Sequence, residues 1–199
     1  CTAGPDKGMK KVVLTTATLA ICDPVLTYKL PPALTAATGL DAFAHCAEAV
    51  TCNMANPLVE TLAMDAISRI CKWLPVAYKE PTNVEAREQM MLAANYGGVA
   101  FSQTCCHLGH AISQQMGAAY HVPHGISCAW ALPEVMAYAA KSKPDKVAMV
   151  ADYLGIAYDK NDSAEVLGQK VADGIRAFMR IMDVKSIKDY GISRDQMLA

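Results

Sequence analysis

The sequence has no excess of charge of either sign. Eighteen Lys and Arg residues stand against nineteen Asp and Glu residues, which gives a formal net charge of −1 at pH 7. Proteins that bind nucleic acid or a membrane surface usually carry a clustered excess of positive charge, and this sequence shows no such cluster. We therefore expect no nucleic-acid partner and no membrane partner.

Long hydrophobic runs are also missing. A helix that spans a bilayer needs about 20 consecutive, mostly apolar residues. His45 and Glu48 interrupt the first long apolar stretch, and Pro133 and Glu134 interrupt a later one. Yet 53% of the 199 residues are hydrophobic and only 19% are charged, a composition that excludes disorder and is sufficient for the core of one domain.

The eight cysteines form no Cys-x-x-Cys pair. They stand at positions 1, 22, 46, 52, 71, 105, 106 and 128, mostly inside apolar helical patterns. Disulfide frameworks are typical of small secreted domains that cannot build a sufficient core, so we expect buried or half-buried free thiols in a reducing cytoplasm. For the adjacent Cys105 and Cys106, a redox-active pair is the alternative to two small packing residues.

A glycine-rich phosphate loop is absent as well. The sequence contains no Gly-x-Gly-x-x-Gly motif, and Gly4–Gly8 does not fit a phosphate cradle preceded by a strand. The chain opens on Cys1 without a Met or a signal-peptide pattern, and the residues from Ile192 onward are typical of a Ser-capped helix cut off after two turns. We expect this chain to be a piece of a longer protein.

Strand signals occur only near the start of the chain. The β-branched residues of Lys10–Thr16 predict a short strand, and Leu19–Cys22 predicts a second one that ends at Asp23 and Pro24. No strand is expected after that point.

Helical patterns account for the remainder. Helical spacing runs from Ala33 to Asn53, with a break expected at Gly39, and Gly97 and Gly98 indicate close packing of a later helix. The other expected elements are a helix opened by Asn56, a helix from Asn83 towards Cys105, helices at His107–Tyr120, Ile126–Lys141, Pro144–Leu154 and Ser163–Met182, and a turn at Val122–Gly125. The sequence therefore predicts a mostly α domain with a short β element at its N-terminus.

The histidines are concentrated in one part of the chain. Four of the five lie within eighteen residues of each other: His107, His110, His121 and His124. The fifth, His45, follows Asp41 by four residues, so the two share one face of a helix. Such a pair can bind a metal ion, or it can form a hydrogen bond that fixes a core histidine. Four imidazoles in one apolar region need partners, which favours a metal site, although spacing alone does not choose the ligands.

Two segments strongly resemble the two signatures of the iron-containing (group III) alcohol dehydrogenase family. Leu34–Ala49 resembles the first signature. Gly109–Gly125, with its histidines fourteen residues apart, resembles the second. The likeness extends from about Lys10 to the last residue.

The resemblance implies the architecture of a dehydroquinate synthase-like protein. It assigns residues 25–199 to an all-helical metal-binding catalytic domain, C-terminally incomplete. It assigns residues 1–24 to the tail end of the nucleotide-binding domain and a connector, so that the α/β dinucleotide-binding domain itself is absent from this chain. Members of the family form dimers and larger assemblies, so the resemblance also implies a homo-oligomer.

The resemblance further implies a metal site and an activity. The family's metal is held by one aspartate and three histidines, which match Asp41, His45, His110 and His124. It favours Fe²⁺, and such ligands also suit Zn²⁺ and Ni²⁺. The implied activity is that of a metal-dependent alcohol dehydrogenase or aldehyde reductase. Hydride moves between a small alcohol or diol and NAD or NADP, while the metal polarises the substrate oxygen.

The same resemblance leads to an expected role or position for five other residues. Phe101 matches a position close to the nicotinamide, and Lys11 matches a lysine that contacts the cofactor. Gln114 stands where many members have another histidine, and an amide can form hydrogen bonds there but cannot carry a proton at neutral pH. His121 is a candidate proton relay, and His107 has no ligand match and is expected to be a neighbour of the site.

Three other functions remain open. A non-haem iron oxygenase also uses histidine and carboxylate ligands, usually two histidines and one carboxylate. A lyase such as a dehydroquinate synthase shares the broad fold. In a non-catalytic helical module, the histidines would be packing residues.

Overall fold

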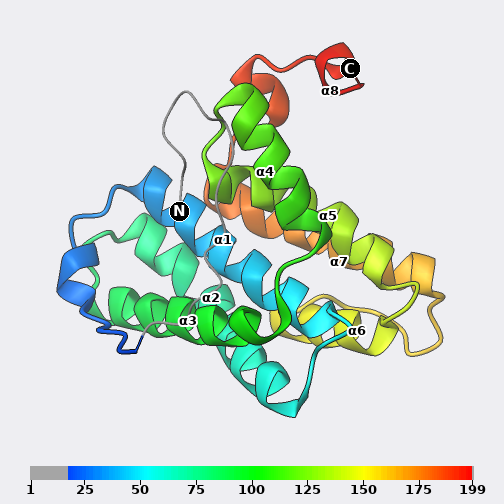
Figure 1. Cartoon of the computed structure of the whole chain (residues 1–199), viewed down its shortest axis with the longest axis horizontal. Coiled ribbons are helices and arrows are strands. Elements are labelled where there is room, and N and C mark those ends of the chain that lie inside the picture. The colour runs from blue at the N-terminus through cyan, green and yellow to red at the C-terminus, as the bar shows by residue number, and fades with distance from the viewer. Residues whose placement is uncertain (1–17, 199) are drawn as a thin grey trace.

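The computed structural model describes residues 18–198, and these residues are almost entirely helical (Figure 1). The elements are a 3-10 helix η1 (Pro24–Thr27), then α1 (Pro32–Thr51), α2 (Pro57–Lys79), α3 (Val84–Thr104), α4 (Leu108–Tyr120), α5 (His124–Ala139), α6 (Pro144–Leu154), α7 (Ala164–Ile181), a 3-10 helix η2 (Ile187–Tyr190) and α8 (Arg194–Leu198). The predicted mostly α class is confirmed. Within residues 18–198 no helix is long and apolar enough to cross a membrane.

The capping residues set the starts of several helices. The side chain of Asn56 accepts hydrogen bonds from two backbone N–H groups in the first turn of α2, each at 3.1 Å. Asn83 accepts one such hydrogen bond in α3, and Ser163 accepts one in α7. Because the first N–H groups of a helix have no partner within it, such side chains fix where the helix begins. These starts agree with the sequence prediction.

Helix α1 is the central element. It packs against α2, α3 and α5 (Figure 1), and 14 of its 20 residues are buried. The break predicted at Gly39 is wrong, because α1 continues through this residue. A Cβ atom at Gly39 would lie 2.3 Å from Cδ1 of Leu74, so the glycine is needed for the close approach of α1 and α2.

The two adjacent glycines of α3 have different surroundings. A Cβ atom at Gly97 would lie 2.8 Å from the Cys46 sulfur on α1, which confirms close packing there. A Cβ atom at Gly98 would have no neighbour within 4 Å. Only Gly97 therefore lets α3 approach the central helix.

The segment Leu19–Cys22 is not a strand. Leu19 is 75% exposed and Ile21 is 83% exposed. A strand requires a neighbouring strand for its backbone hydrogen bonds, and residues 18–198 contain none. The other predicted strand, Lys10–Thr16, lies outside the described residues.

A buried arginine joins α3 to the start of α1. Arg87 is only 2% exposed, and its guanidinium donates to the Thr35 hydroxyl at 2.7 Å and to the backbone carbonyls of Leu30 at 2.9 Å and Pro81 at 3.0 Å. All three acceptors are uncharged. Arg87 thereby holds the loop before α1 and the turn before α3 in fixed positions.

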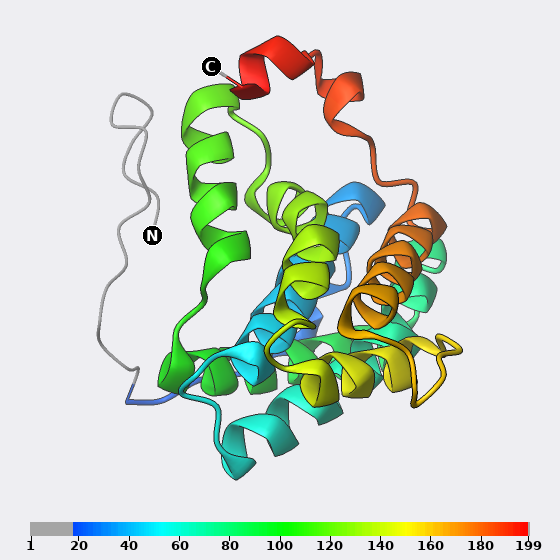
Figure 2. The same ribbon diagram turned by 90° about the vertical axis from the view of Figure 1, so that its right-hand side faces the viewer.

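Helices α4 and α5 complete the part of the fold that carries the histidines. α5 packs against α1 and α7, and α4 packs against α5. Figure 2 shows α4 alongside α5, with α8 near the end of α4, where the Tyr120 hydroxyl donates to the Gln196 carbonyl at 2.5 Å. This arrangement directs the starts of α4 and α5 towards the middle of α1.

Candidate metal centre

Three helices bring the four predicted ligands together. Oδ1 of Asp41 on α1 is the common neighbour of three imidazole nitrogens. It lies 4.0 Å from Nε2 of His45 on α1, 3.4 Å from Nε2 of His110 on α4, and 3.5 Å from Nε2 of His124 at the start of α5. Ligands that share one metal ion at about 2.1 Å lie roughly 3–4 Å from each other. The donor atoms of Asp41, His110 and His124 all lie within 4.8 Å of one another, whereas His45 belongs to a second group of donors with His110 and Cys106.

Two polar atoms at the centre of this cluster have no hydrogen-bond partner. They are Oδ1 of Asp41 and Nε2 of His110, and both are buried. Leaving a buried polar atom unpaired costs about 1–3 kcal/mol. A cation placed between a carboxylate and imidazole nitrogens would satisfy both atoms. The residues therefore fit a divalent metal ion, and their nitrogen and oxygen donors suit Fe²⁺, Zn²⁺ or Ni²⁺.

Glu48 on α1 holds His110 by the ring nitrogen that faces away from the centre of the cluster. Its side chain is fully buried, and Oε2 lies 2.9 Å from Nδ1 of His110. The same carboxylate accepts hydrogen bonds from the backbone N–H groups of His107 at 2.9 Å and Gly109 at 2.5 Å. Helix α4 has no capping side chain of its own, so Glu48 caps it from another helix. This role was not predicted, although a charged residue three positions after His45 in an apolar helix is a signal for it.

Two serines orient His124. Oγ of Ser113 on α4 lies 2.9 Å from Nδ1 of His124 and 2.6 Å from Oγ of Ser127 on α5. With Nδ1 engaged in this way, Nε2 of His124 is directed to Asp41. Partners on the outer nitrogen hold a ligand histidine in the required orientation.

Stacking positions His45. Its ring lies parallel to that of Phe101 at 4.4 Å with a 14° tilt, and to that of His110 at 4.5 Å with a 23° tilt. Phe101 thus forms an apolar wall on the outer side of the cluster. The resemblance placed this residue near the nicotinamide, and the structure places it in contact with a predicted ligand.

The surroundings set the protonation of the cluster. Burial lowers the pKa of His45 to about 4, although the charge of Asp41 opposes this. Burial raises the pKa of Asp41, but the contact with His110 and the charges of the imidazoles outweigh it and lower this pKa to about 2. At neutral pH, Asp41 is therefore an anion and His45 is neutral, which are the forms that bind metal ions. Burial opposes protonation of His110, but its contacts with Asp41, two thiols and Glu48 raise its pKa.

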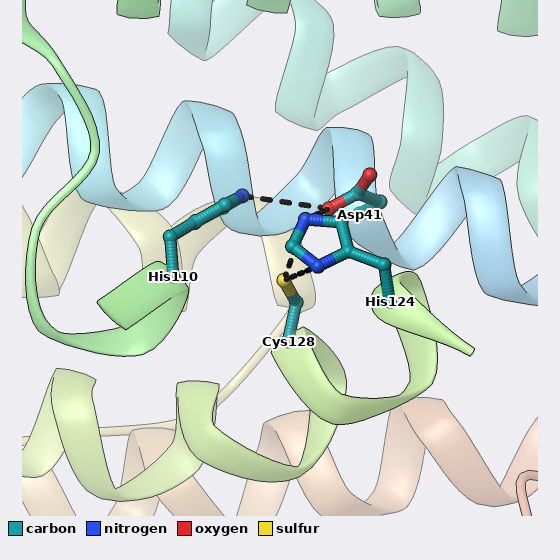
Figure 3. Close-up of side chains that lie close together, drawn as sticks. All are labelled: Asp41, His110, His124 and Cys128. Carbon is teal, nitrogen blue, oxygen red and sulfur yellow. Dashed lines mark hydrogen bonds and ion pairs between the residues drawn. The ribbon is translucent and has the colours of Figure 1, made fainter. Parts of the chain in front are cut away.

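Two thiols border the same cluster. Sγ of Cys128 lies 3.6 Å from Nε2 of His124, and its sulfur and the donor atoms of Asp41, His110 and His124 all lie within 4.8 Å of one another. Figure 3 shows these four side chains converging from α1, α4 and α5. Cys106 forms a second group with two of the imidazoles. Neither thiol was predicted as part of the site, although Cys128 stands one helical turn after His124.

The cysteines that the structure describes are all free, as expected. Cys46 and Cys128 are buried, and three others are half-buried. Cys22 and Cys105 are exposed, so the prediction of buried or half-buried thiols is wrong for these two. Cys22 lies in the extended segment before η1, and Cys105 follows the last residue of α3 with a φ of 63°.

The remaining predicted residues lie around the cluster or away from it. Nε2 of His107 lies 3.0 Å from the Thr51 hydroxyl, and its Nδ1 lies 3.8 Å from Oε1 of Glu48, the residue that contacts His110. Gln114 is half-buried on α4, one turn after His110. His121 is exposed at the end of α4, and no hydrogen bond or ion pair in the described part of the chain joins it to the cluster. Lys11 lies outside the described residues.

Comparison with known proteins gives consistent relationships. The C-terminal model of the Fe-containing alcohol dehydrogenase family matches residues 35–199. The chain is 34% identical to 1,3-propanediol dehydrogenase of Klebsiella pneumoniae over 87% of its own length and 45% of that protein. It is 39% identical to NAD-dependent methanol dehydrogenase of Bacillus methanolicus over 70% of its own length and 37% of that protein.

The same relationship appears in three dimensions. The crystal structure of a 1,3-propanediol oxidoreductase matches with a TM-score of 0.80 and 34% identity, over 86% of this chain and 45% of that one. The chain thus spans less than half the length of these relatives. The family match includes every residue of the candidate metal-binding cluster. The chain belongs to the Fe-containing alcohol dehydrogenase family and corresponds to its C-terminal part.

Proposed function

We propose that this chain is the metal-binding part of a metal-dependent alcohol dehydrogenase or aldehyde reductase. The reaction is hydride transfer between a small alcohol or diol and NAD or NADP. One observation carries the proposal: Oδ1 of Asp41 and Nε2 of His110 are buried, unpaired and directed at each other beside two further imidazoles. Membership of an alcohol dehydrogenase family supports the reaction class.

Four side chains would bind the metal: Asp41, His45, His110 and His124. Fe²⁺ is the proposed ion, with Zn²⁺ and Ni²⁺ as substitutes. A divalent ion at this position supplies a Lewis acid that polarises the oxygen of the alcohol or aldehyde. Glu48 accepts a hydrogen bond from Nδ1 of His110, which directs Nε2 to the centre, where a metal ion would take the place of a proton.

The chain's own residues would also shape the substrate and cofactor side. Phe101 covers His45 with an apolar ring and helps to exclude water from the site. Gln114, one turn beyond His110, offers an amide for hydrogen bonding and no group that transfers protons at neutral pH. Relatives named for methanol and propanediol support a small alcohol or the matching aldehyde as substrate.

Two properties of the whole protein complete the proposal. The free thiols fit a reducing cytoplasm. A homo-oligomeric assembly, a dimer or larger, follows from the family resemblance.

The test is an activity assay on the protein that contains this chain, loaded with Fe²⁺ or Zn²⁺. Oxidation of NADH and of NADPH is followed with propanal and butanal, in the parent protein and in His110→Ala and His107→Ala variants. We expect aldehyde-dependent oxidation that His110→Ala abolishes and His107→Ala retains. Activity that survives His110→Ala would overturn the proposal. Oxygen uptake without aldehyde reduction would support a non-haem iron oxygenase instead.

A further inference from the structure

The inner face of α5 carries a thiol beside the candidate metal centre. Cys128 is 1% exposed and stands four residues after His124, so both side chains lie on the same side of the helix. Figure 3 shows the sulfur and the imidazole of His124 next to each other, facing Asp41 and His110. The predicted set of one carboxylate and three imidazoles makes no use of this sulfur.

The distances around Cys128 are those of a metal ligand. Its sulfur lies 3.6 Å from Nε2 of His124. With a metal–sulfur bond of about 2.3 Å and a metal–nitrogen bond of about 2.1 Å, two neighbouring ligands of a five-coordinate ion, at angles of about 90–120°, lie roughly 3.1–3.8 Å apart. The group of four donors that contains Cys128 shares Asp41, His110 and His124 with the predicted site.

An unpaired nitrogen points into the same space. Nε2 of His110 is buried without a hydrogen bond, and His110 as a whole is only 6% exposed. A thiol that serves only as a packing residue accounts for the burial of Cys128. It does not explain why four possible ligand atoms lie close together around two buried polar atoms that have no hydrogen-bond partner.

Two carboxylates would lie close to a divalent ion bound here, Asp41 among the donors and Glu48 behind His110. Cys128 would join them as the soft donor of the set. On metal binding the thiol loses its proton to solvent, as ligand cysteines do, and no electron is transferred.

Cys106 is the competing thiol, and its position is less suitable. It shares a group with two predicted ligands, His45 and His110, whereas Cys128 shares one with three, Asp41, His110 and His124. It is half-buried on the connection between α3 and α4. Cys128 is instead completely enclosed on a regular helix that already carries a predicted ligand.

We propose that Cys128 is a fifth metal donor, a thiolate that makes this centre favour thiophilic divalent ions such as Zn²⁺ and Cd²⁺. The inference rests on the proposed metal site. It adds a soft ligand to a set of oxygen and nitrogen donors, and soft thiolates bind Zn²⁺ more strongly than hard ions.

The test is a metal titration of the metal-free 199-residue chain with Co²⁺ and Cd²⁺. Metal stoichiometry is measured together with the ultraviolet absorption of sulfur-to-metal charge transfer, which only a bound thiolate produces. Three variants are compared with the parent chain: Cys128→Ser, Cys128→Ala and Cys106→Ser. Circular dichroism shows whether each variant is folded.

We expect about one ion per chain and a charge-transfer band in the parent and in Cys106→Ser, as the four other ligands and Cys128 are intact there. The band should disappear in both Cys128 variants. Their Cd²⁺ affinity should fall by about tenfold or more, since loss of even an outer partner has that effect.

Three results would overturn the inference. In the first, the parent chain binds one ion but shows no charge-transfer band. This result needs no variant, and it leaves the proposed function intact. Another is a band that persists in the folded Cys128 variants or disappears in Cys106→Ser. The third is no stoichiometric binding by the parent chain, which would overturn the proposed metal site as well.

Discussion

Oε2 of Glu48 lies 2.9 Å from Nδ1 of His110. An ionised carboxylate can only accept hydrogen bonds, so Nδ1 of His110 donates to Glu48 and Nε2 faces the centre of the cluster. Because Glu48 also accepts from the backbone at the start of α4, one side chain both caps a helix and orients a predicted metal ligand. The fold and the candidate site therefore depend on the same contact.

Replacement of Glu48 should lower both the stability of the fold and the affinity of the site for a metal ion. In Glu48→Gln the shape is retained, but an amide N–H₂ group would face backbone or imidazole donors. We expect a loss of about 1–3 kcal/mol in the free energy of unfolding, measured in urea, because buried groups become unpaired. Metal affinity should fall by about 10–100-fold. The exposed Glu134→Gln is the control, and equal behaviour of the two variants would contradict the role of Glu48.

Two glycine-to-alanine changes should have opposite effects. A Cβ atom at Gly109 would lie 2.3 Å from Oε1 of Glu48, so Gly109→Ala must displace the carboxylate and destabilise the protein. Gly98→Ala has open space around the new methyl group within a helix, and should stabilise it by about 0.5–1 kcal/mol. Thermal unfolding of both variants measures the difference. A stabilised Gly109→Ala would show that the contact with Glu48 is not required.

Arg87 should not tolerate lysine. Its guanidinium serves three acceptors from two segments, and a single ammonium group cannot reproduce that geometry. We expect Arg87→Lys to lower the free energy of unfolding by about 2 kcal/mol, measured by urea denaturation. Arg180→Lys, at an exposed position, should change it little. Similar stabilities for the two variants would count against a structural role for Arg87.

The thiols should differ in reactivity. Under denaturing, oxygen-free conditions, titration should find all eight cysteines of the sequence free. In the folded chain, Cys22 and Cys105 should react first because they are exposed, and Cys46 and Cys128 last because they are buried. Mass spectrometry after timed alkylation identifies the order. A denatured count well below eight would indicate a disulfide and contradict the expectation of a reducing compartment.

The helices could be predicted from the sequence because their signals are local. Asn56 and Asn83 mark helix starts through side-chain hydrogen bonds to the following residues, and such contacts need no knowledge of the tertiary fold. Leu19–Cys22 shows the limit of local signals, since β-branched and apolar residues form a strand only where a partner strand exists. The break predicted at Gly39 is wrong for a related reason: the role of Gly39 depends on Leu74, which lies on another helix.

Part of the candidate site could not be predicted from the spacing of residues in the sequence. Asp41 and His45 share a helix face, which their separation predicts. Glu48 and Cys128 are identified only when α4 and α5 are placed against α1, because their partners lie on other helices. Spacing therefore gives residues on one helix, and the packing of helices decides which donors meet.

The metal centre is tested most directly by the metal content of the chain and of three histidine variants, measured after dialysis against a limited excess of Zn²⁺ or anaerobic Fe²⁺. We predict about one ion per chain, as one shell of four to five donors requires. His45→Ala and His110→Ala should lose stoichiometric binding, while His107→Ala, whose imidazole contacts Thr51, should retain it. Equal loss of metal in His107→Ala, or full retention in His110→Ala, would contradict the assignment of the metal centre.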